Sequence, residues 1–198
     1  MATSTKLVSP LKRGFKTNAE KIAGQYRREL GLKEYDPMPA IQLAKHLSVR
    51  IMVPTEIPGM TEDIIDVLIN GPGKGNWSAA IYQKNSKKYI IHNPTHSICR
   101  QESNLMHELA HAACEHELEG LESALSGCLL PLRKYNEVQE AEAECLGAVL
   151  HLPQKALFHY HHILKKTPDE ISQSFNASKE MVRFRLGTSG VTKIKFNK

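Results

Sequence analysis

The chain has 198 residues, of which 41% are hydrophobic and 24% are charged, and its formal net charge is +5. This length suits one ordinary domain whose core needs no disulfide or metal merely to hold together, and the composition excludes a wholly disordered chain. No apolar stretch approaches the roughly 18 residues of a membrane span, and the N-terminus is polar and basic from Met1 to Lys6. We therefore expect neither a transmembrane helix nor a secretory signal, and we expect a cytoplasmic protein.

The first half of the chain predicts helices followed by a strand. Residues 1–16 have scattered apolar positions, which indicates a flexible basic lead-in. A helix is expected from an N-cap at Asn18 to Gly31, with apolar residues on one face. The pair Asp36-Pro37 has the residue types that begin a second helix. Residues 49–53 alternate between apolar and polar side chains, which predicts a strand.

The following residues predict a hairpin and then a helical second half. Residues 60–69 fit either a helix or a strand, and Thr61 as an N-cap favours the helix. The runs Trp77–Tyr82 and Tyr89–Asn93 have strand character and are joined by polar residues. From Arg100 onward the pattern is helical almost to the end. The predicted fold class is α+β, with a small antiparallel or mixed sheet and a helical core.

The most informative motif is His107-Glu108-Leu109-Ala110-His111. On a helix, side chains four residues apart share a face and lie about 6 Å apart along the axis. Two imidazoles at that spacing can share one zinc ion, Zn²⁺. Glu108 is then placed to take a proton from a zinc-bound water. The motif predicts metal-assisted hydrolysis.

A zinc site needs a third protein ligand, and the acidic segment 137–144 is the main source of one. Glu140 and Glu144 are four residues apart, so they share a face of the helix predicted there. One carboxylate could complete a His-His-Glu site while the other orients a ligating imidazole. The alternative interpretation of the segment is an acidic, solvated helix face.

Several ordered blocks of the sequence are shared with a known family. They are residues 91–97, residues 100–111 with the two histidines, residues 135–144 running on to 150–153, and the C-terminal runs 171–178 and 181–186. With these blocks the sequence resembles the ImmA/IrrE metallopeptidases over roughly residues 17–192. The resemblance implies a minimal zincin-like metallopeptidase fold.

The same resemblance implies roles for individual residues. It makes His107 and His111 zinc ligands and Glu108 the general base. The first glutamate of the later block, Glu140, becomes the third ligand, and Glu142 is the competing candidate.

Three positions of the later block depart from the family pattern. Glu144 stands where Asn or Asp is usual, Gly147 where Ala is common, and His151 where an apolar residue is common. No ligand is lost by these departures. With Glu140 as ligand, Glu144 is the residue expected to hold an imidazole in place.

The chain is expected to divide into the lead-in 1–16, a zinc metallopeptidase domain 17–164 and a basic helical segment 165–198 packed on it. In the last segment, Thr167 and Ser178 have the character of N-caps of two short helices. A helix-turn-helix that contacts DNA is the competing interpretation of this segment. We favour helices that pack on the peptidase domain.

One cysteine is a candidate for regulation. A thiolate in the open position of the zinc would silence the enzyme until it was displaced. Cys128 lies between the two metal blocks and is the possible regulatory thiol. Cys114 shares the face of the histidines but lies a full turn beyond them.

The family resemblance implies a protein substrate, namely a helix-turn-helix transcriptional repressor whose cleavage derepresses a stress, prophage or defence operon. The rival hypothesis is a non-proteolytic regulator that contains zinc and binds DNA or a repressor. Residues 1–34 and 165–198 each carry eight Lys or Arg against three acidic residues. These basic ends could contact single-stranded or duplex DNA, although a solvated surface is the more common reason for such charge. No membrane partner is expected.

Overall fold

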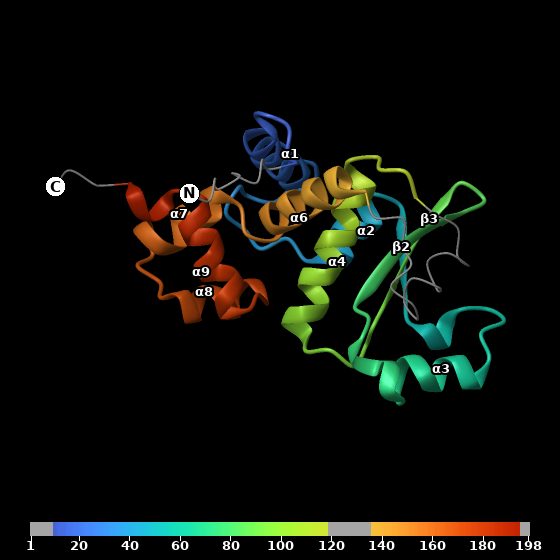
Figure 1. The fold of residues 1–198 in the computed structure, drawn as a ribbon. Helices are drawn as coiled ribbons and strands as arrows, with labels where there is room; N and C mark the ends of the chain where they lie inside the picture. Colours follow the sequence, from blue (N-terminus) through green and yellow to red (C-terminus); the bar gives the residue numbers. More distant parts are fainter. Residues whose placement is uncertain (1–9, 119–135, 195–198) are drawn as a thin grey trace, which may run out of the picture.

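The computed structural model describes residues 10–118 and 136–194, which form helices around one small sheet (Figure 1). The helices are α1 (Phe15–Glu29), α2 (Ala40–His46), α3 (Glu62–Ile69), α4 (Ile98–Ala113), α6 (Glu137–His151), α7 (Gln154–Phe158), α8 (Pro168–Phe175) and α9 (Lys179–Thr188). The strands are β1 (Val49–Met52), β2 (Ala79–Lys84) and β3 (Lys87–His92). The predicted α+β class is confirmed. Within the described residues, no helix is both long and apolar enough to cross a membrane.

The sheet is mixed and has the strand order β1-β3-β2. β3 runs parallel to β1 and antiparallel to β2, as the predicted hairpin requires. The hairpin turn is tighter than the sequence suggested, because Asn85 and Ser86 alone form it with φ values of 50° and 60°. A two-residue turn with positive φ at both positions matches the twist of the flanking strands. Both strands therefore continue closer to the turn than predicted: β2 ends at Lys84, and β3 begins at Lys87.

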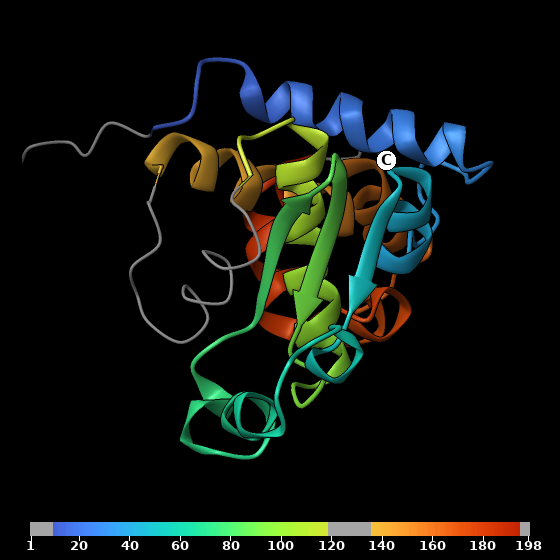
Figure 2. The ribbon, with the colours of Figure 1, turned by 90° about the vertical axis from the view of Figure 1, so that its right-hand side faces the viewer.

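Each face of the sheet packs against a different core. On one face, Val49, Ile81 and Ile90 pack with buried residues of α1, α2, α4 and α6. On the other face, Met52 and Tyr82 pack with a cluster that includes residues of α3. Figure 2 shows the sheet in front of α4, with α1 running across one end of the strands. The helix α4, which carries the histidine motif, is thus held directly behind the sheet.

The helices α4 and α6 approach each other closely at Gly147. A Cβ atom added to Gly147 would lie 2.9 Å from His107 Cα and 3.0 Å from the carbonyl oxygen of Met106. Real Cβ atoms essentially never come that close, so only a residue without a side chain fits here. The departure from the family pattern at Gly147 therefore has a physical reason in this chain. The missing side chain at Gly147 lets α6 lie directly against the backbone of His107, the first histidine of the motif.

Arg27 joins α1 to α6 inside the core. Its side chain is fully buried, and its Nη2 donates to the carbonyl oxygen of Leu150 at 3.0 Å. Its Nε donates to the carbonyl oxygen of Asp36, also at 3.0 Å. Burial lowers the pKa of the guanidinium to about 10. At neutral pH, Arg27 is a buried cation that binds α6 and the loop after α1 through their backbone carbonyls.

Two predicted helix starts are wrong. α1 begins at Phe15 after Gly14, whose φ of 86° ends the preceding turn, and Asn18 lies inside the first helical turn. α2 begins at Ala40 after Pro39, not at Asp36-Pro37. Pro39 explains the second difference, because a residue that precedes proline is disfavoured in helical conformation.

The C-terminal helices have a core of their own. Leu152, Leu157, Ile171 and Val182 are buried in it between α7, α8 and α9. The predicted N-caps are confirmed, since the side chains of Thr167 and Ser178 accept hydrogen bonds from backbone N–H groups at the starts of α8 and α9. Figure 1 shows these helices on the side of α4 and α6 opposite to the sheet. The proposed division of the chain at residues 16 and 164 stays a prediction.

Arg185 attaches α9 to the rest of the chain. Its Nε donates to the carbonyl oxygen of Leu152 at 3.0 Å, and its Nη2 contacts Glu20 Oε1 of α1 at 2.8 Å. The second oxygen of Glu20 accepts from the backbone N–H of Gln154 at 2.9 Å. These bonds place α9 beside the starts of α1 and α7, where it borders the cavity described below.

Candidate metal centre

The two histidines of the motif lie on one face of α4 and point the same nitrogen at each other. His107 Nε2 and His111 Nε2 are 3.3 Å apart. Glu140, in the first turn of α6, brings Oε2 to 3.3 Å from His107 Nε2 and Oε1 to 3.6 Å from His111 Nε2. In the part of the chain that the structure describes, these three residues are the one group whose donor atoms are placed to hold a metal ion.

This donor set fits zinc. Tetrahedral zinc binds imidazole nitrogen and carboxylate oxygen at about 2.0–2.2 Å, which separates neighbouring ligand atoms by roughly 3.3–3.6 Å. His107 Nε2 lies within that range of both His111 Nε2 and Glu140 Oε2, and His111 Nε2 lies within it of the other carboxylate oxygen, Oε1. Two histidines and one carboxylate also leave one tetrahedral position open, as catalytic zinc sites do.

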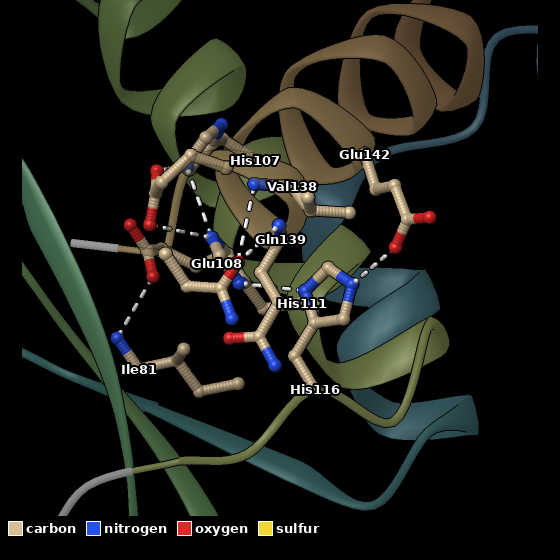
Figure 3. A network of polar contacts seen from close by, with 10 residues as sticks. Ile81, His107, Glu108, His111, His116, Val138, Gln139 and Glu142 are labelled. Atoms are coloured by element: carbon tan, nitrogen blue, oxygen red, sulfur yellow. Dashed lines mark hydrogen bonds and ion pairs between the residues drawn. The ribbon is translucent and has the colours of Figure 1, made fainter. Parts of the chain in front are cut away.

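A third histidine supports the site from behind. His116 Nδ1 lies 2.9 Å from His111 Nδ1, and His116 Nε2 lies 3.1 Å from Glu142 Oε2 (Figure 3). If His111 Nε2 faces a metal ion, its proton must be on Nδ1 and is donated to His116 Nδ1. The proton of His116 is then on Nε2 and is donated to Glu142. With one proton in each of these two hydrogen bonds, the orientation of the His111 ring is fixed.

The end of α4 explains how His116 reaches His111. Glu115 has a φ of 55°, and the chain closes two backbone hydrogen bonds, from Glu115 N–H to the Ala112 carbonyl and from His116 N–H to the His111 carbonyl. This pair of bonds is the Schellman motif, in which the residue after the left-handed position folds back on the residue five before it. The contact is usually apolar, and here it joins two imidazoles.

The structure places Glu142 and Glu144 in different surroundings. Glu144 is exposed and lines a cavity beside the metal group. The acid that contacts His116 is Glu142, two residues after Glu140 on α6. That Glu144 holds a ligating histidine stays a prediction. Sequence reasoning missed His116, although a histidine just beyond the motif was the available signal.

Glu108 lies between the metal group and the sheet. Its side chain is 4% exposed, and Oε2 accepts a hydrogen bond of 2.9 Å from the backbone N–H of Ile81 in β2 (Figure 3). β2 is at the edge of the sheet as described, so this N–H is available to a side chain of α4. The bond holds the carboxylate beside the two histidines.

Within residues 10–118 and 136–194, no cysteine belongs to the group that could hold a metal ion. Cys128 lies outside the described residues, so its regulatory role stays a prediction. Cys114 is half-buried against the main core, and burial raises the pKa of its thiol to about 11, with a smaller contribution from Glu142. Cys114 is therefore a neutral thiol at physiological pH and has the character of a packing residue.

A histidine pair on one helix, a glutamate from a second helix and a buried carboxylate beside them define the class of metallopeptidases with a His-Glu-x-x-His helix. The family model of the IrrE N-terminal-like domain, Peptidase_M78, matches residues 64–187, which is more than half of the chain. The chain therefore belongs to this metallopeptidase family, and the resemblance to ImmA/IrrE proteins is confirmed. No curated protein and no solved structure gave a match.

Proposed function

We propose that the protein is a cytoplasmic, zinc-dependent endopeptidase that cleaves a helix-turn-helix transcriptional repressor and so derepresses a stress, prophage or defence operon. The observation that carries the enzymatic part is the spacing of the donor atoms of His107, His111 and Glu140, which suits tetrahedral zinc. Membership of the metallopeptidase family supports it independently. The repressor as substrate rests on the family resemblance.

In this proposal the three ligands hold zinc, and Glu108 moves the proton. Bound zinc supplies Lewis acidity, which makes water more acidic and a carbonyl carbon more electrophilic. Glu108 accepts the proton of the attacking water at its carboxylate and delivers it to the nitrogen of the leaving amine. The hydrogen bond from Ile81 N–H keeps that carboxylate in place through both transfers. The His116–Glu142 pair keeps the ring of His111 in the orientation that presents Nε2.

The test uses Glu108→Gln, which keeps the size of the side chain and removes its basicity. Zinc content is measured by mass spectrometry of the purified proteins, and cleavage is measured on purified helix-turn-helix repressors by the masses of the fragments. We expect Glu108→Gln to bind one zinc ion as wild type does and to cleave at least about 100-fold more slowly. Glu62→Gln, an exposed glutamate of α3, is the matched control and should cleave normally.

A reporter gene controlled by the repressor distinguishes the peptidase from the rival hypothesis, a regulator without proteolytic activity. A peptidase derepresses the reporter in the wild type and not in Glu108→Gln. If both proteins derepress it equally and the repressor stays intact, the peptidase proposal fails. Salt-dependent DNA binding that is lost on trimming either basic end would instead support the nucleic-acid role.

A further inference from the structure

A cavity of about 940 Å³ begins at the metal centre and extends away from the sheet. His107 and Glu140 line one end of it, and the start of α1 and one face of α9 line the remainder. From α6 the lining residues are Glu137, Glu140, Ala141, Glu144, Cys145, Ala148 and Val149. They recur every three to four residues, so they form one continuous stripe along the helix.

The length of this stripe suits an extended peptide. From Glu140 to Ala148 the helix rises about 12 Å, because each residue adds about 1.5 Å. An extended chain covers about 3.3 Å per residue, so the cavity spans roughly three to four residues beyond the metal ligands. Two of the three proposed metal ligands, His107 and Glu140, line one end, so the cavity opens beside the metal centre.

The charges that remain unpaired along the stripe are mostly acidic. Glu137 and Glu144 are exposed and lie one turn before and one turn after Glu140. The Glu20–Arg185 pair in the wall is satisfied internally, as described above. Lys16 is the remaining lining cation among the described residues. Glu144 therefore offers an exposed carboxylate to a basic side chain, and Lys16 and Arg185 are the nearby cations.

The far end carries an exposed aromatic side chain. Phe184 of α9 is 56% exposed although Arg185 fixes its helix to Glu20 of α1 and to Leu152, the residue after α6. Exposure alone does not distinguish Phe184 from Ile163, but Phe184 lines the cavity, where its ring can contact a bound apolar side chain. The apolar residues Ala148 and Val149 lie in the same wall.

We propose that this cavity receives the protein substrate on one side of the scissile bond, as an extended segment with a basic residue near Glu144 and an apolar residue against Phe184. This inference rests on the proposed peptidase function and names the class of sequence that it accepts. Glu144 and Phe184 select the substrate, and α9 forms part of the substrate-binding surface in addition to its packing role.

The test uses zinc-loaded wild type, Glu144→Gln and Phe184→Ala with a library of random decapeptides, and the product termini are determined by mass spectrometry. We expect Lys or Arg within two residues of the cut and Leu, Ile or Phe three to four residues from it, on the same side. Glu144→Gln should reduce the basic preference about two- to fivefold, as expected for a partly exposed ion pair. Phe184→Ala should reduce the apolar preference about tenfold.

Matched controls lie outside the cavity. Glu62→Gln removes an exposed helix carboxylate, and Ile163→Ala truncates an apolar side chain that is 54% exposed. Both should leave the preferences unchanged. Binding is measured separately by fluorescence anisotropy of labelled library peptides on zinc-loaded Glu108→Gln protein, where adding Phe184→Ala should weaken binding about tenfold with unchanged zinc content.

The outcomes separate this inference from the function on which it rests. If zinc-loaded wild type cleaves no peptide and no repressor, the peptidase proposal fails and the inference fails with it. If it cleaves with preferences that neither Glu144→Gln nor Phe184→Ala alters, the inference alone is overturned. A wild-type dimer that Phe184→Ala converts to a monomer in solution would also overturn it, because the cavity would then receive a second copy of the chain.

Discussion

His116 and His111 contact each other through their Nδ1 atoms at 2.9 Å, and the other nitrogen of His116 contacts Glu142. The pair links a ligand of the metal centre to a carboxylate on the neighbouring helix. Groups of this kind orient a ligating imidazole and raise its basicity. We therefore predict that His116→Ala and Glu142→Ala each lower zinc affinity about 10- to 100-fold. The zinc affinity of each variant is measured by competition with a chromogenic chelator at neutral pH.

Glu144→Gln is the control for this prediction, because the carboxylate of Glu144 is exposed and the acid that contacts His116 is Glu142. Its zinc affinity should match that of wild type. A loss of zinc on Glu144→Gln, with normal affinity in Glu142→Ala, would restore the role that the sequence suggested for Glu144 and would contradict the geometry.

The identity of the third ligand gives a second prediction. Glu140→Ala removes the carboxylate that lies 3.3 Å from His107 Nε2, whereas Glu142→Ala removes a group that acts only through His116. Zinc affinity should therefore fall further in Glu140→Ala than the about 100-fold limit expected for a supporting group. If Glu142→Ala instead lost more zinc affinity than Glu140→Ala, the third ligand would be Glu142.

Gly147 gives a prediction about stability. Gly147→Ala places a Cβ 2.9 Å from His107 Cα, so α6 must move away from α4 and carry Glu140 with it. We expect a loss of about 1–3 kcal/mol in the free energy of unfolding, measured in urea, together with weaker zinc binding. Gly187→Ala in α9 is the control, because a Cβ there meets nothing within 4 Å. It should stabilise the protein by about 0.5–1 kcal/mol, and a similar change in both variants would contradict the close approach.

His151 gives a prediction about pH. Burial lowers the pKa of this imidazole, Arg27 lowers it further, and the hydrogen bond with the Phe175 carbonyl acts in the opposite direction. Between the folded pKa and the unfolded value of about 6.5 the unfolded chain binds more protons, so stability falls as the pH drops below about 6.5. The melting temperature should decrease from pH 7 to pH 5, and the decrease should be smaller in His151→Leu. Equal slopes would show that His151 does not titrate on unfolding.

Local features of the fold were predictable because they depend on neighbouring residues. The spacing of His107 and His111 places them on one helix face wherever that helix packs, and the caps at Thr167 and Ser178 act within a single turn. The errors at Asn18 and Asp36 are local as well. At the first position Gly14 adopts the left-handed conformation just before α1, which glycine does without a steric penalty. At the second, Pro39 disfavours helical conformation in the residue before it.

The sequence by itself determined the class of chemistry, because His107, Glu108 and His111 lie within five residues and helical periodicity alone brings them together. Only the tertiary structure decided which glutamates contact the histidines of the site. The close approach of α6 to α4 at Gly147 brings Glu140 to the histidines, and the left-handed turn at Glu115 brings His116 between His111 and Glu142. The same packing turns Glu144 to the cavity. Glutamates two residues apart have the same chemistry, so the crossing of two helices is what distinguishes them.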